Sequence, residues 1–129
     1  MTNMLHHISF AVSDITRSSL FYDACLEALG YKRVYSSDHF IGYGVEEGKD
    51  KFAIVNKSKK ILLPETGLHI AFSAPNRDSI DQFFSLAIEN GGKDNGAPGL
   101  RDHYGKNYYA AFVIDPDGYH IEAVFNQPI

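Results

Sequence analysis

Hydrophobic and polar positions along the chain follow one pattern that occurs twice. Residues 5–12 and residues 68–74 alternate apolar and polar side chains, as a strand with one buried face does. Each stretch precedes a segment whose apolar residues recur at helical spacing. In the second half these are Ile80, Phe83, Phe84, Ala87 and Ile88, at i, i+3, i+4, i+7 and i+8. The pattern predicts a strand followed by an amphipathic helix in both halves.

The two patterns are related by a constant offset. His69 follows His7 by 62 residues, and a constant offset over a long span indicates a duplicated unit. The same offset matches seven further pairs: Ile8 with Ile70, Phe10 with Phe72, Asp14 with Asn76, Phe21 with Phe83, Tyr22 with Phe84, Glu27 with Glu89 and Gly30 with Gly92.

Polar and glycine residues delimit both helices. Asp14 and Asn76 are the expected N-caps, because their short side chains accept hydrogen bonds from the free N–H groups of a first helical turn. Gly30 and the pair at 91–92 are the expected ends, because glycine adopts a left-handed cap without steric cost. Further strands are predicted at 31–35, 39–43, 51–55, 107–114 and 119–125, with a linker at 57–67, a loop at 94–99 and a tight turn at 115–118.

These elements predict an α+β fold made of two tandem βαβββ modules, at about 5–60 and 67–126, within a single domain of residues 1–129. We expect each mixed sheet to curl away from its helix, so that the two sheets form a half-open barrel around a shared hollow.

Strand parity indicates which side chains could meet in that hollow. His7 and His69 lie on the faces directed away from the helices, and so does Glu122 in the last strand, whereas His6 has the opposite parity. Two imidazoles and a carboxylate on rigid strands can hold a divalent transition metal and leave positions open for water or substrate. The residues alone leave a second interpretation open: the histidines are duplicated strand-start residues and Glu122 is an exposed residue of an edge strand.

Composition excludes several classes of function. A net charge of −4, scattered along the chain, argues against binding to nucleic acid or to an anionic membrane surface. No apolar run approaches the roughly 20 residues of a membrane helix, and the N-terminus has no signal-peptide pattern, so a cytoplasmic protein is expected. The single cysteine, Cys25, is predicted to pack in the core rather than to react.

Three features of the chain occur together: the paired openings at 7–14 and 68–72, the Gly30 stop, and the segment from Ala111 through Asp-Pro-Asp-Gly to Glu122. In this combination the chain resembles the vicinal oxygen chelate superfamily. That superfamily includes glyoxalase I, extradiol dioxygenases, and fosfomycin and bleomycin resistance proteins. The resemblance implies that His7, His69 and Glu122 are metal ligands. It also implies a homodimer, because relatives cover their edge strands with a second chain.

The resemblance therefore implies a metal-dependent enzyme that acts on a small oxygen-chelating substrate by lyase, isomerase or dioxygenase chemistry, with Fe, Mn, Ni, Co or Zn as the metal. The alternative is a metal-free drug-binding protein of the bleomycin-resistance type. Glyoxalase I has a fourth ligand on the last strand of its first module. Here only Asn56 offers an oxygen in that strand, which argues against lactoylglutathione lyase activity.

Further candidates lie in the polar and aromatic segment at 101–109. Arg101 can bind a carboxylate or phosphate through two parallel hydrogen bonds, and His103 or Tyr104 could exchange protons with a substrate. An ordinary solvated loop is the other interpretation of this segment. Tyr35, His39 and Tyr43 could face the same hollow from the first module, and the sequence does not decide among them.

Overall fold

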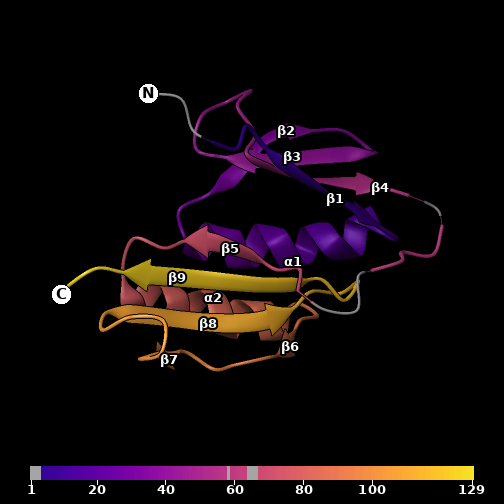
Figure 1. Ribbon diagram of the computed structural model, residues 1–129. Coiled ribbons are helices and arrows are strands. Elements are labelled where there is room, and N and C mark those ends of the chain that lie inside the picture. The colour runs from indigo at the N-terminus through magenta and orange to yellow at the C-terminus, as the bar shows by residue number, and fades with distance from the viewer. Residues whose placement is uncertain (1–3, 58, 64–66) are drawn as a thin grey trace.

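Each half of the chain folds as one mixed sheet with one helix (Figure 1). The computed structural model describes residues 4–57, 59–63 and 67–129. Residues 1–3, and residues 58 and 64–66 of the predicted linker, lie outside the described part. None of the helices in the described ranges has both the length and the apolar character to cross a membrane.

The first half forms sheet A, with strand order β1-β4-β3-β2 and β1 parallel to β4. Its elements are β1 (Ile8–Val12), α1 (Ile15–Ala28), β2 (Lys32–Ser36), β3 (Phe40–Gly44) and β4 (Phe52–Asn56).

The second half forms sheet B, with order β5-β9-β8-β6, and β7 also pairs with β8. Its elements are β5 (Ile70–Ser73), α2 (Arg77–Glu89), β6 (Lys93–Asp94), β7 (Gly99–Leu100), β8 (Tyr108–Ile114) and β9 (His120–Asn126). The predicted α+β class is confirmed, with two helices and two mixed sheets in the described residues. Sheet A has the four strands of a βαβββ module, whereas sheet B has five, one more than predicted.

The boundaries of several predicted elements require correction. The first strand begins at Ile8 rather than near residue 5, and β5 is shorter than the predicted strand at 68–74. The predicted loop at 94–99 begins in β6 and ends in β7. Its composition is typical of a turn, but its backbone pairs with the edge of β8, where Asn95 N donates to Phe112 O at 3.0 Å.

The predicted helix caps are confirmed. Asp14 accepts a hydrogen bond from the backbone N–H of Arg17 at 3.2 Å, and Asn76 accepts one from Ser79 at 2.8 Å. After α1, Gly30 adopts a positive φ of 95°, which an L side chain rarely adopts, so a glycine is required at this stop.

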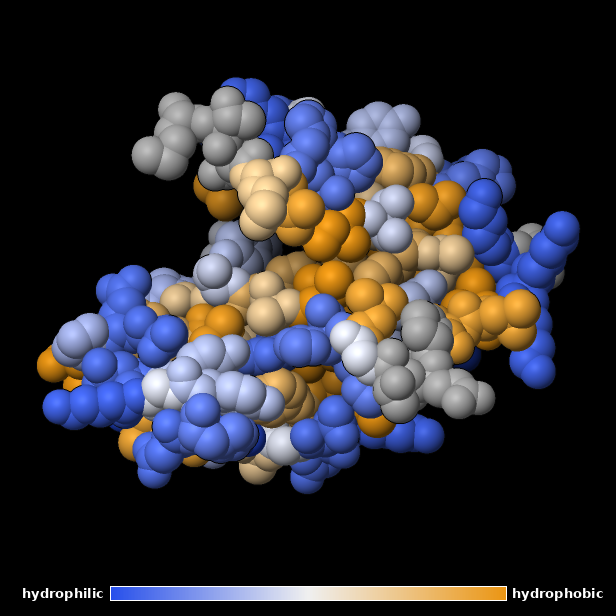
Figure 2. All heavy atoms as spheres, in the orientation of Figure 1, coloured by the Kyte–Doolittle hydropathy of each residue, from blue (hydrophilic) through white to orange (hydrophobic). Residues whose placement is uncertain are grey.

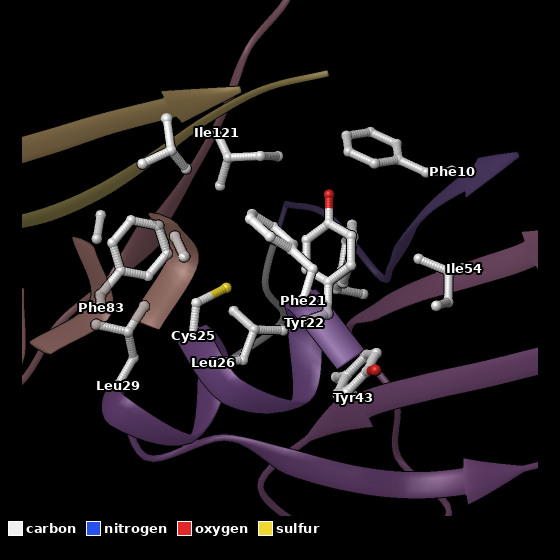
Figure 3. Packing of buried hydrophobic residues seen from close by; sticks show 14 of the residues in the cluster. Phe10, Phe21, Tyr22, Cys25, Leu26, Leu29, Tyr43, Ile54, Phe83 and Ile121 are labelled. Atoms are coloured by element: carbon white, nitrogen blue, oxygen red, sulfur yellow. The ribbon is translucent and has the colours of Figure 1, made fainter. Parts of the chain in front are cut away.

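One hydrophobic core joins the helix-facing sides of both sheets. Phe21 and Tyr22 of α1 and Phe83 of α2 belong to one cluster of buried side chains, which also includes Phe10 from sheet A and Ile121 from sheet B (Figure 3). Cys25 is part of this core, as predicted, and burial raises the pKa of its thiol well above the usual value. Both helices therefore lie against the same interior.

The turn between β8 and β9 ties sheet B to the start of α1. The Asp117 side chain, only 4% exposed, accepts hydrogen bonds from the Ser13 hydroxyl at 2.6 Å and from Arg17 Nη2 at 2.9 Å, and also from the Ser18 hydroxyl. Asp115 accepts a hydrogen bond from the buried Tyr22 hydroxyl at 2.5 Å. Burial raises the pKa of Asp115. We call Asp115 and Asp117, with these partners, the inter-module brace.

The brace and the common core fix the directions in which the sheets face. Sheet A exposes the side directed away from α1, and sheet B exposes the side directed away from α2; we call these the open faces. In Figure 1, β1 and β5 run in opposite directions. The segments that lead into these two strands therefore approach them from opposite ends.

We expect Asp117→Ala to lower the free energy of unfolding by about 2 kcal/mol, because it removes several hydrogen bonds to a buried carboxylate. Urea unfolding followed by circular dichroism measures the change. The control is Glu46→Ala, which removes an exposed pair with Lys49 and should leave the unfolding midpoint where it is. Equal midpoints for both variants would contradict a stabilising role for the brace.

Candidate functional site

Glu122 is a buried acidic residue on the open face of sheet B. It lies in β9, the strand between β5 and β8, where its register partners are Ala71 and Phe112. Only 1% of the residue is exposed. A buried carboxylate is costly unless both oxygens have partners, so its surroundings decide what it can do.

Both oxygens of Glu122 have a partner. His69, which directly precedes β5, places Nε2 3.0 Å from Glu122 Oε1. The Tyr108 hydroxyl, from β8, donates a hydrogen bond to Glu122 Oε2. Burial, and then the hydrogen bond to Glu122, raise the pKa of Tyr108 well above its usual value. The result is a Tyr108–Glu122–His69 cluster with one side open, since the His69 side chain is 53% exposed.

The separation between His69 and Glu122 fits a shared metal ion. Adjacent ligands at about 2.1 Å from a metal lie roughly 3 Å from each other, close to the 3.0 Å between His69 Nε2 and Glu122 Oε1. A neutral imidazole and a carboxylate are also suitable donors for a transition metal. The pair supplies two ligands. No group of three or more His, Cys, Asp or Glu side chains among residues 4–57, 59–63 and 67–129 is placed to hold a metal.

His7, the third predicted ligand, is not brought to this pair. It is exposed directly before β1, and its Nδ1 lies 2.8 Å from Nδ1 of His6. The opposite directions of β1 and β5 account for the separation, because each histidine precedes its own strand (Figure 1).

Asn56, the one oxygen donor that the sequence offered as a fourth ligand, has a structural role. Its Oδ1 accepts a hydrogen bond from the backbone N–H of Ile15 at 3.1 Å. That N–H belongs to the first turn of α1, where backbone donors have no partner within the helix. The side chain thus completes the start of α1.

Arg101 is held in a fixed position beside the β7–β8 segment. Its Nη1 donates to Gly99 O at 2.9 Å and its Nη2 to Ala97 O at 2.7 Å, while Cζ lies 5.3 Å from the centre of the Phe112 ring. Gly96 permits this approach, because a Cβ there would lie 3.1 Å from the Phe112 ring. Within the described ranges no acidic side chain forms an ion pair with Arg101, so its charge remains available.

An open pocket of about 280 Å³ lies beside this guanidinium. Its walls include Arg101, His103, Tyr104 and Phe112. His103 packs against Tyr104 with ring centres 4.1 Å apart, and Tyr104 lies 5.2 Å from Tyr108. The predicted candidates at 101–104 are therefore grouped, and Tyr108 connects them to Glu122.

The first-module candidates do not gather at this site. Tyr43 is buried in the core and donates a hydrogen bond to Asp23 at 2.8 Å. Tyr35 is 53% exposed and packs near Phe40, with ring centres 5.6 Å apart. His39 is exposed before β3.

A separate cleft lies between the two halves, alongside β5 (Figure 2). It has a volume of about 420 Å³, and its floor includes Phe52 and Phe72, whose ring centres are 5.1 Å apart. The Tyr31 hydroxyl donates to Ser73 O at 2.7 Å across one end. Ser73 and Ala71 border this cleft, and Ala71 pairs with Glu122, so the cleft adjoins the open face of sheet B.

Sequence reasoning missed Tyr108. The polar and aromatic segment at 101–109 contains it, but two tyrosines in succession do not show by themselves which one faces the site. A usable indication existed: Tyr108 is four residues from Phe112, the register partner of Glu122, and therefore shares its face.

The model of the Glyoxalase/Bleomycin resistance protein/Dioxygenase superfamily matches residues 4–123. The chain belongs to this superfamily. A relative in Bacillus subtilis (strain 168), the uncharacterized protein YqjT, is 32% identical, over 93% of this chain and 97% of its own.

Solved structures agree with the superfamily assignment. A glyoxalase/bleomycin resistance protein from Albidiferax ferrireducens T118 is 29% identical, with a TM-score of 0.82, over 98% of this chain and all of its own. Glyoxalase I from Zea mays has the same fold at 22% identity and a TM-score of 0.73; the match covers 94% of this chain and 45% of the maize chain.

We expect Arg101→Lys to weaken binding of inorganic phosphate, because lysine keeps the charge but loses the planar fork that Gly99 and Ala97 hold in place. Phosphate titration followed by amide chemical shifts measures affinity and location together. Arg33→Lys is the control, since Arg33 is already paired with Asp23 at 2.6 Å. Equal affinity for wild type and the Arg101 variant would mean that Arg101 only braces its loop.

Proposed function

We propose that this protein is a divalent-metal-dependent enzyme of the superfamily, acting on a small substrate that chelates the metal through oxygen atoms. The observation that carries the proposal is the buried Glu122 carboxylate beside His69 Nε2, at the separation of two ligands on one metal. Lyase, isomerase and dioxygenase chemistry are all compatible with such a pair.

We further propose that His7 reaches the metal from a second copy of the chain. His7 is exposed, and in the part of the chain that the structure describes it is not placed with His69 and Glu122 around a common metal position. In a symmetric dimer, sheet A of one copy can oppose sheet B of the other, and symmetry produces two equivalent sites. The same arrangement would cover edge strands such as β5.

The proposed roles of the side chains follow from their positions. A bound metal would supply Lewis-acid polarisation of the substrate oxygens. Glu122 is the anionic ligand, and His69 is its neighbouring nitrogen ligand. Arg101 holds an anionic group of the substrate in the adjoining pocket. His103 and Tyr104, at the rim of that pocket, exchange protons with the bound substrate.

A metal-free binding protein of the bleomycin-resistance type is the second candidate function. The observation that favours it is the grouping of Tyr104 and Tyr108, 5.2 Å apart, beside an open pocket. The two rings are tilted by 51° to each other, and neighbouring aromatic faces of this kind can pack against a planar ligand. The two candidates differ in whether the protein binds a metal at all.

We expect Glu122→Gln to lower the affinity for divalent metal at least about tenfold, because it removes the anionic ligand. The measurement is titration of apo-protein with Mn²⁺, Ni²⁺ and Zn²⁺, and with Fe²⁺ under anaerobic conditions. Glu46→Gln, far from the site and exposed, serves as the control. If the wild type binds none of these metals, the metalloenzyme proposal is wrong and the drug-binding alternative takes its place.

The origin of His7 can be tested by mixing variants. His7→Ala and Glu122→Gln should each bind metal poorly alone. A mixed dimer would contain one site with His7 from one copy and His69 and Glu122 from the other, so refolding the two variants together should restore strong binding. No restoration, or a monomer by light scattering at micromolar concentration, would contradict a site shared between copies.

A further inference from the structure

We propose that Tyr108 is a positioning residue that holds one oxygen of Glu122 and so limits this carboxylate to binding a metal through the other oxygen. The inference rests on the proposed metal site, and it assigns a role to a residue outside the ligand set. It concerns how Glu122 binds a metal, whatever the reaction.

The geometry divides the carboxylate between two partners. Tyr108 donates to Oε2, while Oε1 faces His69 Nε2 at 3.0 Å. A metal between His69 and Glu122 would therefore meet Oε1. Oε2 already accepts the hydrogen bond from Tyr108, which withdraws electron density from this oxygen and makes it the weaker of the two donors to a metal.

The position of the Tyr108 hydroxyl is itself restricted. Its strand, β8, is paired along its whole length with β9, which carries Glu122. On the other side the ring lies 5.2 Å from Tyr104, which packs on His103. A side chain held by both strand pairing and neighbouring rings loses little further freedom when it donates to Glu122.

A hydrogen bond to a ligating carboxylate influences the metal in two ways. It orients the carboxylate before the metal arrives, and removing such a partner typically lowers metal affinity about 10–100-fold. It also uses one lone pair of Oε2 and weakens this oxygen as a donor, which favours binding of the metal through Oε1 alone. Tyr108→Phe removes the hydroxyl but keeps the ring, so both effects should appear without loss of packing.

The neighbouring residue provides a matched control. Tyr109 also donates its hydroxyl to a carboxylate, Asp81, at 2.6 Å, but from the opposite face of β8. That hydrogen bond is the largest of the effects that raise the pKa of Tyr109 to about 12. Tyr109→Phe therefore removes an equivalent hydrogen bond from the same strand, away from Glu122.

The test is titration of apo wild type, Tyr108→Phe and Tyr109→Phe with Co²⁺, whose visible absorption reports coordination number and geometry. We expect Tyr108→Phe to bind Co²⁺ about tenfold more weakly and to show weaker visible bands, because Glu122 can then bind through both oxygens. Tyr109→Phe should match the wild type in affinity and spectrum.

Three outcomes would overturn the inference. If Tyr108→Phe keeps the wild-type spectrum and affinity, Tyr108 does not control Glu122, although the metal site itself stands. If Tyr109→Phe changes the spectrum as much as Tyr108→Phe does, the effect comes from β8 in general. If the wild type binds no Co²⁺ while remaining folded by circular dichroism, the proposed metal site fails, and the role of Tyr108 fails with it.

Discussion

The structure depends on a pair of buried carboxylates at the turn between β8 and β9. Asp117 collects donors from the start of α1, and Asp115 accepts from Tyr22 in the core. These contacts join residues about a hundred positions apart, so they attach the second half to the first. Because the turn leads directly into β9, the same attachment sets where Glu122 lies. The brace therefore links the stability of the two halves to the geometry of the candidate site.

The duplication made most of this fold predictable. An offset of 62 residues related the two strand–helix units, and alternation placed the helix-facing residues on the correct side. The repeat register ends after Gly30, and the less regular parts lie beyond it. The short strands β6 and β7 were missed because their turn-like sequence is paired by the edge of β8, a tertiary effect that local composition does not contain.

The candidate site was predictable only in part. Parity placed His69 and Glu122 on one face, and the structure brings them together. The same parity could not reveal that His7 would not join this pair within the chain, because that depends on how the two sheets pack. Tyr108 was not singled out within the segment at 101–109, although its face follows from the register of β8 with β9. Residues that act through another side chain carry no sequence pattern of their own.

The apolar and polar faces of the two sheets have different roles in the chain. The helix-facing sides form the core, and one of the opposite faces carries the buried Glu122. Joining both helices in one core buries the apolar faces of the two sheets, and among the described residues the opposite faces lie outside that core. Glu122 is nevertheless fully buried on one of them, which requires donors for both of its oxygens. Tyr108 and His69 provide those partners, but His69 remains half exposed.

A second copy that covers this face would remove that imidazole from water, and a cation shared with Glu122 would then compensate the buried charge. Association and metal binding would in that case stabilise each other, as two ligands for the same state of a protein must.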